Sequence, residues 1–130
     1  MTELIRILYV EDEPDIREIA VMALELVGGF TLCVCESGTQ AVEKARAFQP
    51  QLALLDIMMP GMDGPTTMNR LHTIEELADL PVIFMTAKVQ PQEIAEYLEI
   101  GALDVIAKPF DPMTLPDRVN AVWNRAIHGS

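Results

Sequence analysis

The sequence predicts an α/β fold with one mostly parallel, five-stranded sheet and five helices that cover both of its faces. Five short apolar runs alternate with five segments whose apolar residues recur at helical spacing, as expected for repeated strand–helix units. Half of the 130 residues are hydrophobic, so the chain can bury a core without disulfides or a structural metal. No repeat, low-complexity segment or linker interrupts this pattern, and we expect residues 1–130 to form a single domain.

The first strand–helix unit is marked by an acidic run between its two elements. Residues 5–10 are almost all apolar and predict a strand that ends at the acidic residues 11–13. Pro14 fits the first turn of the following helix, where its missing N–H removes no hydrogen bond, and the glycines 28–29 end that helix. The apolar positions expected to share one face of the helix are Ile16, Ile19, Ala20, Ala23 and Val27.

A second unit and a third strand follow. Residues 30–35 alternate weakly and predict a strand. Ser37 and Gln40 have the spacing of a capping box, which predicts a helix that Pro50 ends. The apolar run 52–55 predicts a third, fully buried strand that ends on a single carboxylate.

Two further strands complete the sheet. A helix is predicted to begin at residues 64–65, and its spacing of apolar residues ends near residues 75–76. A fourth strand is predicted at residues 82–85. Pro91 fits the first turn of the next helix, and residues 103–107 predict the fifth strand.

The last helix is expected to begin at Asp111, with Asp111 as its cap and Pro112 in its first turn. Its apolar stripe is predicted to be Leu115, Val119, Val122, Trp123 and Ala126.

The charge of the chain restricts its partners. Twenty acidic residues against nine basic ones give a formal charge of −11, which repels nucleic acids and anionic membranes unless a basic patch overrides it. The sequence has no run of Lys and Arg, and no apolar run near the roughly 20 residues that span a bilayer. Residues 1–6 lack the apolar core of a signal peptide, and Cys33 and Cys35 are predicted to be small apolar residues in a reducing compartment. We therefore expect a cytoplasmic protein without direct nucleic-acid or membrane contacts.

Charged and hydroxyl side chains stand directly after four of the five predicted strands: Glu11 and Asp12, Asp56, Thr86, and Lys108. In a parallel sheet the carboxyl ends of all strands lie on one edge, so these residues become neighbours. Carboxylates held this close raise one another's pKa unless a cation joins them. A hard divalent ion with oxygen ligands, Mg²⁺, suits such a set.

Asp56 is the predicted phosphate acceptor. It ends a buried strand, and Pro60, Gly61 and Gly64 after it form a loop whose backbone can approach a ligand closely. A carboxylate can attack phosphorus, and the transfer needs little beyond charge neutralisation and alignment.

The other strand-end residues are expected to stabilise the transferred group. Mg²⁺ held by Asp12 and Asp56 would neutralise one side of the phosphoryl group, and Lys108 the other. The hydroxyl of Thr86 would donate to a phosphoryl oxygen, and the small Ala87 beside it leaves room for the group to enter.

The whole chain resembles the CheY-like receiver domains of response regulators in two-component signalling. The resemblance rests on four motifs in the family's order and at its spacings: Glu11-Asp12, Asp56 with Met59-Pro60-Gly61-Met62-Asp63-Gly64, Thr86-Ala87, and Lys108-Pro109. It implies a doubly wound, flavodoxin-like sheet with strand order 2-1-3-4-5.

The resemblance also implies a metal site. Asp56 would take a phosphoryl group from a histidine kinase or phosphotransfer protein, with Mg²⁺ as cofactor. Asp12, Asp56 and the backbone carbonyl of Met58 would be direct metal ligands, and Glu11 would act through water. The family catalyses only its own phosphorylation and dephosphorylation, so no enzyme acting on an outside substrate is implied.

The resemblance also implies how the signal is passed on. Thr86 and Lys108 would bind the phosphoryl group, and the Lys108-Pro109 bond is usually cis in the family. The surface of the fourth helix, fifth strand and fifth helix would then control a downstream protein or a fused output domain, and two copies of the family often pair through it.

Two positions depart from the family's pattern. Glu11 stands where an aspartate is commoner, which lengthens the arm of one carboxylate. Val105 stands three residues before Lys108, where the family often has an aromatic that turns inward on activation. A valine cannot report the state in that way, so the signal would depend on Thr86 and the following loop and helix. Tyr97 suits either half-buried packing or a partner surface.

Two other functions fit less well. A small aspartyl-nucleophile phosphatase usually has a second aspartate two residues after the nucleophile, where this chain has Met58. A flavodoxin-like FMN module would place its phosphate against the acidic run 11–13, which is hostile without a metal. Asp63 is expected to cap a helix, and His72 and His128 to lie at the surface or its boundary.

Overall fold

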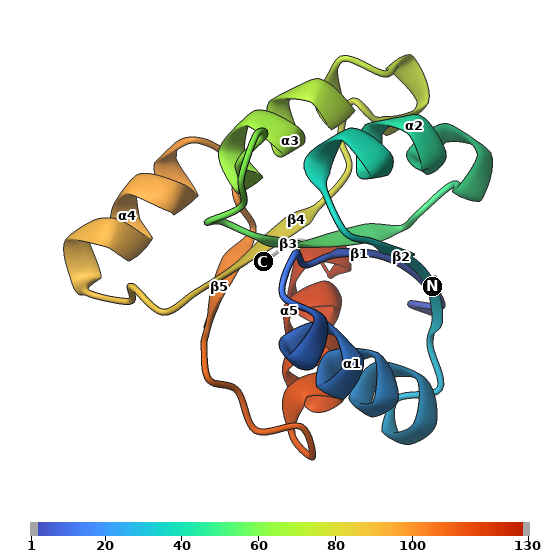
Figure 1. Cartoon of the computed structure of the whole chain (residues 1–130), viewed down its shortest axis with the longest axis vertical. Coiled ribbons are helices and arrows are strands. Elements are labelled where there is room, and N and C mark those ends of the chain that lie inside the picture. Colours follow the sequence, from blue (N-terminus) through green and yellow to red (C-terminus); the bar gives the residue numbers. More distant parts are fainter. Residues whose placement is uncertain (1–2, 129–130) are drawn as a thin grey trace.

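The computed structural model describes residues 3–128 and has the predicted α/β architecture (Figure 1). Its five strands are parallel and follow the order β2-β1-β3-β4-β5, so the predicted flavodoxin-like order is confirmed. The strands are β1 (Arg6–Val10), β2 (Thr31–Cys35), β3 (Leu52–Asp56), β4 (Val82–Thr86) and β5 (Asp104–Ala107).

The helices cover both faces of the sheet. In Figure 1, α2, α3 and α4 lie on one face and α1 and α5 on the other. The α-helices are α1 (Pro14–Met22), α2 (Gly38–Phe48), α3 (Gly64–His72), α4 (Pro91–Glu99) and α5 (Leu115–Ile127). A π-helical segment, η1 (Ala23–Val27), continues α1, and a 3-10 turn, η2 (Glu75–Leu77), follows α3.

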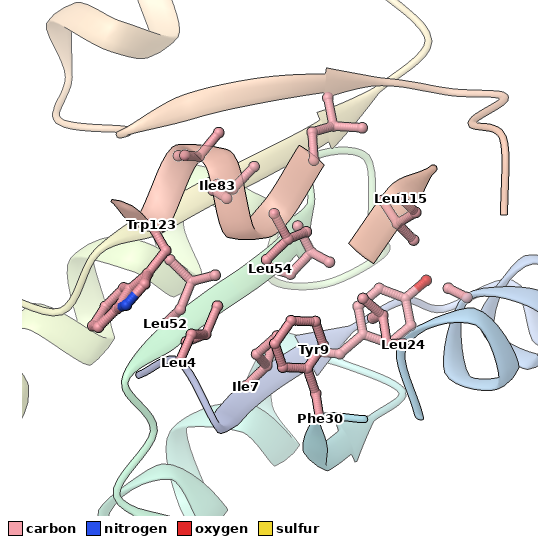
Figure 2. Close-up of a cluster of buried hydrophobic side chains, with 14 of the residues drawn as sticks. Leu4, Ile7, Tyr9, Leu24, Phe30, Leu52, Leu54, Ile83, Leu115 and Trp123 are labelled. Carbon is pink, nitrogen blue, oxygen red and sulfur yellow. The ribbon is translucent and has the colours of Figure 1, made fainter. Parts of the chain in front are cut away.

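Side chains of each strand alternate between two apolar cores. On β1, Ile7 and Tyr9 enter the core beneath α1 and α5, part of which Figure 2 shows. Leu8 and Val10 enter the core beneath α2 and α3. All residues of the central strand β3 are buried, and burying a Leu side chain contributes about 1.5–3 kcal/mol. The sheet edge that carries the predicted site therefore stands on a well-packed base.

The first helix differs from its prediction in the face it buries. Ala20 and Ala23 are buried as expected, but Ile19 and Val27 are 48% and 51% exposed, and Leu24 is buried instead. The amide of Gly28 donates to the carbonyl of Ala23, which closes a π-helical turn. This wider turn shifts the residues at the end of the helix, so a strict helical period misplaces Val27. Ile19 precedes the turn, and the turn does not explain its exposure.

The predicted start of the last helix was wrong. The Asp111 carboxylate accepts a hydrogen bond from the Met113 amide at 2.9 Å, which forms a separate turn, and α5 begins only at Leu115. Pro116 explains the break, because it has no N–H to donate to the preceding turn. Of the predicted stripe, Leu115, Val119, Val122 and Trp123 are buried.

Candidate functional site

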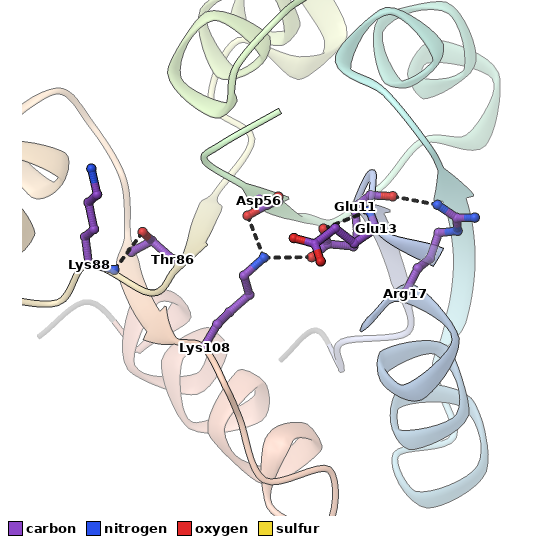
Figure 3. Close-up of polar contacts among 7 residues, drawn as sticks. All are labelled: Glu11, Glu13, Arg17, Asp56, Thr86, Lys88 and Lys108. Carbon is purple, nitrogen blue, oxygen red and sulfur yellow. Dashed lines mark hydrogen bonds and ion pairs between the residues drawn. The ribbon is translucent and has the colours of Figure 1, made fainter. Parts of the chain in front are cut away.

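The sheet brings the predicted strand-end residues to one edge. The register of β1 against β3 places Glu11 beside Asp56. On the other side of β3, the amide of Lys108 donates to the carbonyl of Thr86 at 2.9 Å, which joins the ends of β4 and β5. Residues separated by up to 97 positions in sequence therefore share one small region (Figure 3).

Lys108 links two of the carboxylates. Its ammonium donates to Oδ1 of Asp56 at 2.9 Å and to Oε1 of Glu11 at 3.1 Å (Figure 3). Glu11 is fully buried and Asp56 is 2% exposed, so this ammonium is the main compensation for two charges removed from water. The Lys108-Pro109 peptide bond is cis, as the resemblance implied.

Three acidic side chains at this edge form a group that can hold a metal ion. One oxygen each from Glu11, Asp12 and Asp56 lies within 4.8 Å of the other two. Oδ1 of Asp12 is buried and has no hydrogen-bond partner among the described residues. An unpartnered carboxylate oxygen beside two others is the donor set that a hard cation prefers, so the residues present fit Mg²⁺.

The electrostatics of the site show a shortage of positive charge. Burial, together with the neighbouring charge of Asp56, raises the pKa of Glu11 to about 7, although Lys108 acts to lower it. Burial also raises the pKa of Asp56, again against the effect of Lys108. Burial acts to lower the pKa of Lys108, but its bonds to both carboxylates outweigh this and raise it. A bound cation would relieve this imbalance.

Thr86 ends the neighbouring strand and is 2% exposed. Its hydroxyl oxygen accepts a hydrogen bond from the amide of Lys88 at 3.0 Å (Figure 3). A rotation of the Thr86 side chain that moves this oxygen toward Asp56 would break that bond, which links Thr86 to the loop after β4.

The loop after Asp56 is held tightly against the strand. The amide of Gly64 donates to the carbonyl of Ile57 at 2.9 Å, and Gly61 has a φ of +80°, in the left-handed region that favours glycine. The predicted capping role of Asp63 is confirmed, since its carboxylate accepts from the Thr66 amide at 2.9 Å. The side chain of Met58, whose carbonyl is the predicted third ligand, is turned outward.

Other residues discussed from the sequence lie away from this edge or support it. Val105 is buried and pairs with Phe84, on whose ring Tyr97 of α4 packs edge-on at 5.7 Å between centroids. His72 is half-buried and bonds to a backbone carbonyl, whereas His128 is exposed, as predicted.

Arg17 was not foreseen as a supporting residue. Its guanidinium donates to the backbone carbonyl of Glu11 at 2.9 Å and pairs with Glu36 at 3.4 Å, which fixes the end of β1. The only signal in the sequence is one basic residue after the acidic run 11–13, which does not distinguish it from a solvated helix residue.

Known proteins share this sequence pattern. Residues 7–120 match the response regulator receiver domain family. The chain is 38% identical over 130 residues to the transcriptional regulatory protein CseB of Streptomyces avermitilis, covering 100% of this chain and 54% of that protein. It is 40% identical over 123 residues to the phosphate regulon transcriptional regulatory protein PhoB of Pseudomonas aeruginosa, covering 95% of this chain and 53% of that protein. The chain spans about half the length of these relatives.

The fold matches that of solved structures. The chemotaxis protein CheY4 of Vibrio cholerae superposes with a TM-score of 0.84 at 24% identity, covering 92% of this chain and 99% of that one. Within residues 3–128, none of the helices has the length and apolar character needed to cross a bilayer.

Proposed function

Because this chain belongs to the family of response regulator receiver domains in two-component signalling, we propose that it is a phosphorylation-controlled switch with Asp56 as the phosphate acceptor. The observation that carries this proposal is the geometry around Asp56. Its carboxylate is held by Lys108 at 2.9 Å, and the same acidic group contains Asp12, one of whose oxygens has no hydrogen-bond partner within residues 3–128.

In the proposed transfer, an Asp56 oxygen attacks phosphorus while the bond between phosphorus and the donor's nitrogen breaks. The leaving nitrogen keeps the electron pair and takes up a proton, and Asp56 becomes an acyl phosphate. Lys108 would move with the incoming phosphoryl group and neutralise the charge of its oxygens. The Thr86 hydroxyl would donate a hydrogen bond to another phosphoryl oxygen. The donor would be a histidine kinase or a phosphotransfer protein.

We propose that Asp12, Asp56 and the Met58 carbonyl would hold Mg²⁺ directly, with Glu11 acting through water. The bound ion would supply charge neutralisation for the phosphoryl oxygens. The acidic group fits this role, because it contains more negative charge than Lys108 alone compensates.

The signal would leave through the loop after β4. The bond between Thr86 and the Lys88 amide is lost when the hydroxyl turns to the phosphoryl group, and this loop leads directly into α4. Helix α4 buries none of its residues, and Leu98 is 43% exposed. We propose that phosphorylation moves α4 and thereby controls a downstream protein or an attached output domain through the α4-β5-α5 face. Alternatively, the movement of α4 would allow two copies of the chain to pair through this face.

The test is labelling of the purified chain by acetyl phosphate in the presence of Mg²⁺. Asp56→Asn removes the nucleophilic carboxylate and should abolish labelling, as followed by intact mass spectrometry. Asp63→Asn is the matched control, because asparagine also caps helices and residue 63 should not take the phosphoryl group. Labelling that persists in Asp56→Asn would contradict the proposal.

A further inference from the structure

One polar group beneath the site is left without a hydrogen bond. The hydroxyl of Tyr9 is buried and has no hydrogen-bond partner among the described residues, and the whole side chain has 0% exposure. Burying an unpaired hydroxyl costs free energy, and such groups are rare in native structures. Phenylalanine would fill the same space without that cost, so packing alone does not explain a tyrosine at this position.

The ring of Tyr9 lies in an apolar cluster with Leu24, Phe30 and Leu115. In Figure 2 the ring extends from β1 past Leu24, and the hydroxyl lies at the rim of the cluster, on the side of α1. Leu54 of β3 pairs with Tyr9 across the sheet. Nothing in this apolar lining accepts a hydrogen bond from the hydroxyl.

Charged groups lie just beyond that lining. Tyr9 precedes Glu11 by two positions, and the ladder continues through Glu11, whose amide donates to the Cys35 carbonyl at 3.1 Å. The side chains of Tyr9 and Glu11 therefore emerge on the same face of the sheet. Burial raises the pKa of Tyr9, and the nearby carboxylates of Glu11 and Asp56 raise it further.

Glu11 loses its charged donor when the site is loaded. Its Oε1 is bonded to the Lys108 ammonium at 3.1 Å, and its Oε2 accepts from the Glu13 amide at 3.2 Å. In the proposed function, Lys108 turns to the phosphoryl group on Asp56. Oε1 of a fully buried carboxylate then loses its strongest donor, which is costly.

We propose that Tyr9 is a positioning residue that exchanges partners with Lys108. When Lys108 binds the phosphoryl group, the Tyr9 hydroxyl donates its hydrogen bond to the Glu11 carboxylate. The longer arm of glutamate, compared with aspartate, gives this carboxylate the reach to approach Tyr9. This inference rests on the proposed function, because it requires a phosphoryl group that draws Lys108 away.

The exchange makes the unpaired hydroxyl a feature of one state only. In the unphosphorylated protein it is unsatisfied, and in the phosphorylated protein it satisfies Glu11 and keeps it directed at the metal side of the site. Tyr9 should therefore favour the phosphorylated state over the unphosphorylated one, without touching the phosphoryl group.

Tyr9→Phe tests this with beryllium trifluoride as the phosphoryl mimic at saturating Mg²⁺. Without the mimic, the variant should melt at the same temperature as the wild type or higher, because an unpaired buried hydroxyl is removed. With the mimic, its affinity should fall about tenfold, the lower range for a hydrogen bond to a charged group. Equal affinity in Tyr9→Phe and wild type would overturn the inference.

A second measurement separates hydrogen bonding from packing. The chain has 2 tyrosines, so Tyr97→Phe leaves the ring Cζ carbon of Tyr9 as the single signal in a ¹³C-tyrosine NMR spectrum. That signal should shift when the mimic binds, and Tyr97→Phe also serves as the matched control for affinity. The inference would also be overturned if Tyr9→Phe bound the mimic more weakly while the Tyr9 signal of Tyr97→Phe did not shift on binding. A wild type that neither binds the mimic nor labels with acetyl phosphate would instead contradict the proposed function.

Discussion

At the scale of single residues, the chemistry of the site depends on one ammonium group that serves two buried carboxylates. Lys108 contacts both Glu11 and Asp56 within 3.1 Å, and Asp12 adds a third acid to the same group. Such an arrangement is poor for stability, since replacing buried ion pairs by apolar residues often stabilises a protein. In the proposed function, the charge imbalance favours the entry of a cation, which would then compensate the charge of the phosphoryl group.

The raised pKa of Glu11 makes the metal-free protein sensitive to pH. The folded protein holds a proton on Glu11 up to about pH 7, whereas in the unfolded chain that proton leaves near pH 4.5. Because the folded state binds more protons in this window, the free energy of unfolding should fall as the pH rises, by about 3 kcal/mol. Urea unfolding between pH 4.5 and 8 without divalent metal measures this.

Glu11→Gln is the control for that measurement. Glutamine does not titrate, so the fall in stability between pH 4.5 and 7 should become smaller, and the part that remains comes from Asp56, whose pKa burial also raises. A wild-type stability that rises through this window would show that Glu11 is ionised in the folded protein and that its environment is more polar than its burial indicates.

Lys108 itself should be required for the stability of the metal-free protein. Lys108→Met keeps a long apolar chain but leaves Asp56 and Glu11 without a cation, so the free energy of unfolding at pH 8 should fall by about 2–3 kcal/mol. Lys88→Met is the matched control, because Lys88 is exposed and only its backbone bonds to Thr86, and it should change stability by less than about 0.5 kcal/mol. Equal stabilities for the two variants would contradict the bridging role.

At the scale of elements, the junction between β3 and α3 fixes the direction of Asp56. A Cβ added to Gly64 would lie 2.7 Å from the Asp56 carbonyl oxygen and 2.9 Å from the Cα of Ile57. Both are backbone atoms that cannot turn aside, so Gly64→Ala must displace the strand end. We expect a loss of about 1–3 kcal/mol and slower labelling of Asp56 by acetyl phosphate.

Gly29→Ala separates a displaced Asp56 from a general loss of stability as the cause of slower labelling. Gly29 has a φ of +73° and no atoms within 4 Å of an added Cβ, so alanine there costs about 1 kcal/mol through backbone strain alone. Gly29 precedes β2, at the edge of the sheet opposite Asp56. Its variant should therefore be less stable yet labelled at the wild-type rate, and a labelling rate reduced equally in both variants would point to general loss of stability.

The elements also show what could be predicted from the sequence. Apolar runs located the strands, and the residues after four of these runs located the candidate site, because parallel strands end on one edge. The π-turn of η1 was not predictable, since it depends on a single hydrogen bond that the hydrophobic pattern does not record. The start of α5 at Leu115 was predictable in part, because Pro116 is visible in the sequence, and the prediction from Asp111 and Pro112 overlooked it. Arg17 and the Tyr9 hydroxyl were not predictable either, because the first is recognised by its bond to the Glu11 carbonyl and the second by the absence of a partner among the described residues.

At the scale of the whole molecule, the chain carries a formal charge of −11, so any divalent cation stabilises it to some degree by screening. A cation bound at the strand ends should add a saturable stabilisation of about 2.7 kcal/mol when Mg²⁺ is present at 100 times its dissociation constant. The two contributions can be separated, because screening depends on total charge whereas site binding depends on particular oxygens.

Asp12→Asn and Asp15→Asn remove the same charge from different places. Asp12 lies in the acidic group and has an oxygen without a hydrogen-bond partner in the described part of the chain, whereas Asp15 is exposed on α1. We expect Asp12→Asn to abolish the saturable increase in melting temperature with Mg²⁺, and to melt no lower than the wild type without metal, because it relieves repulsion within the group. Asp15→Asn should retain the full increase, measured at constant ionic strength. If both variants respond to Mg²⁺ alike, the ion acts on the net charge of the molecule and the strand-end acids do not form a metal site.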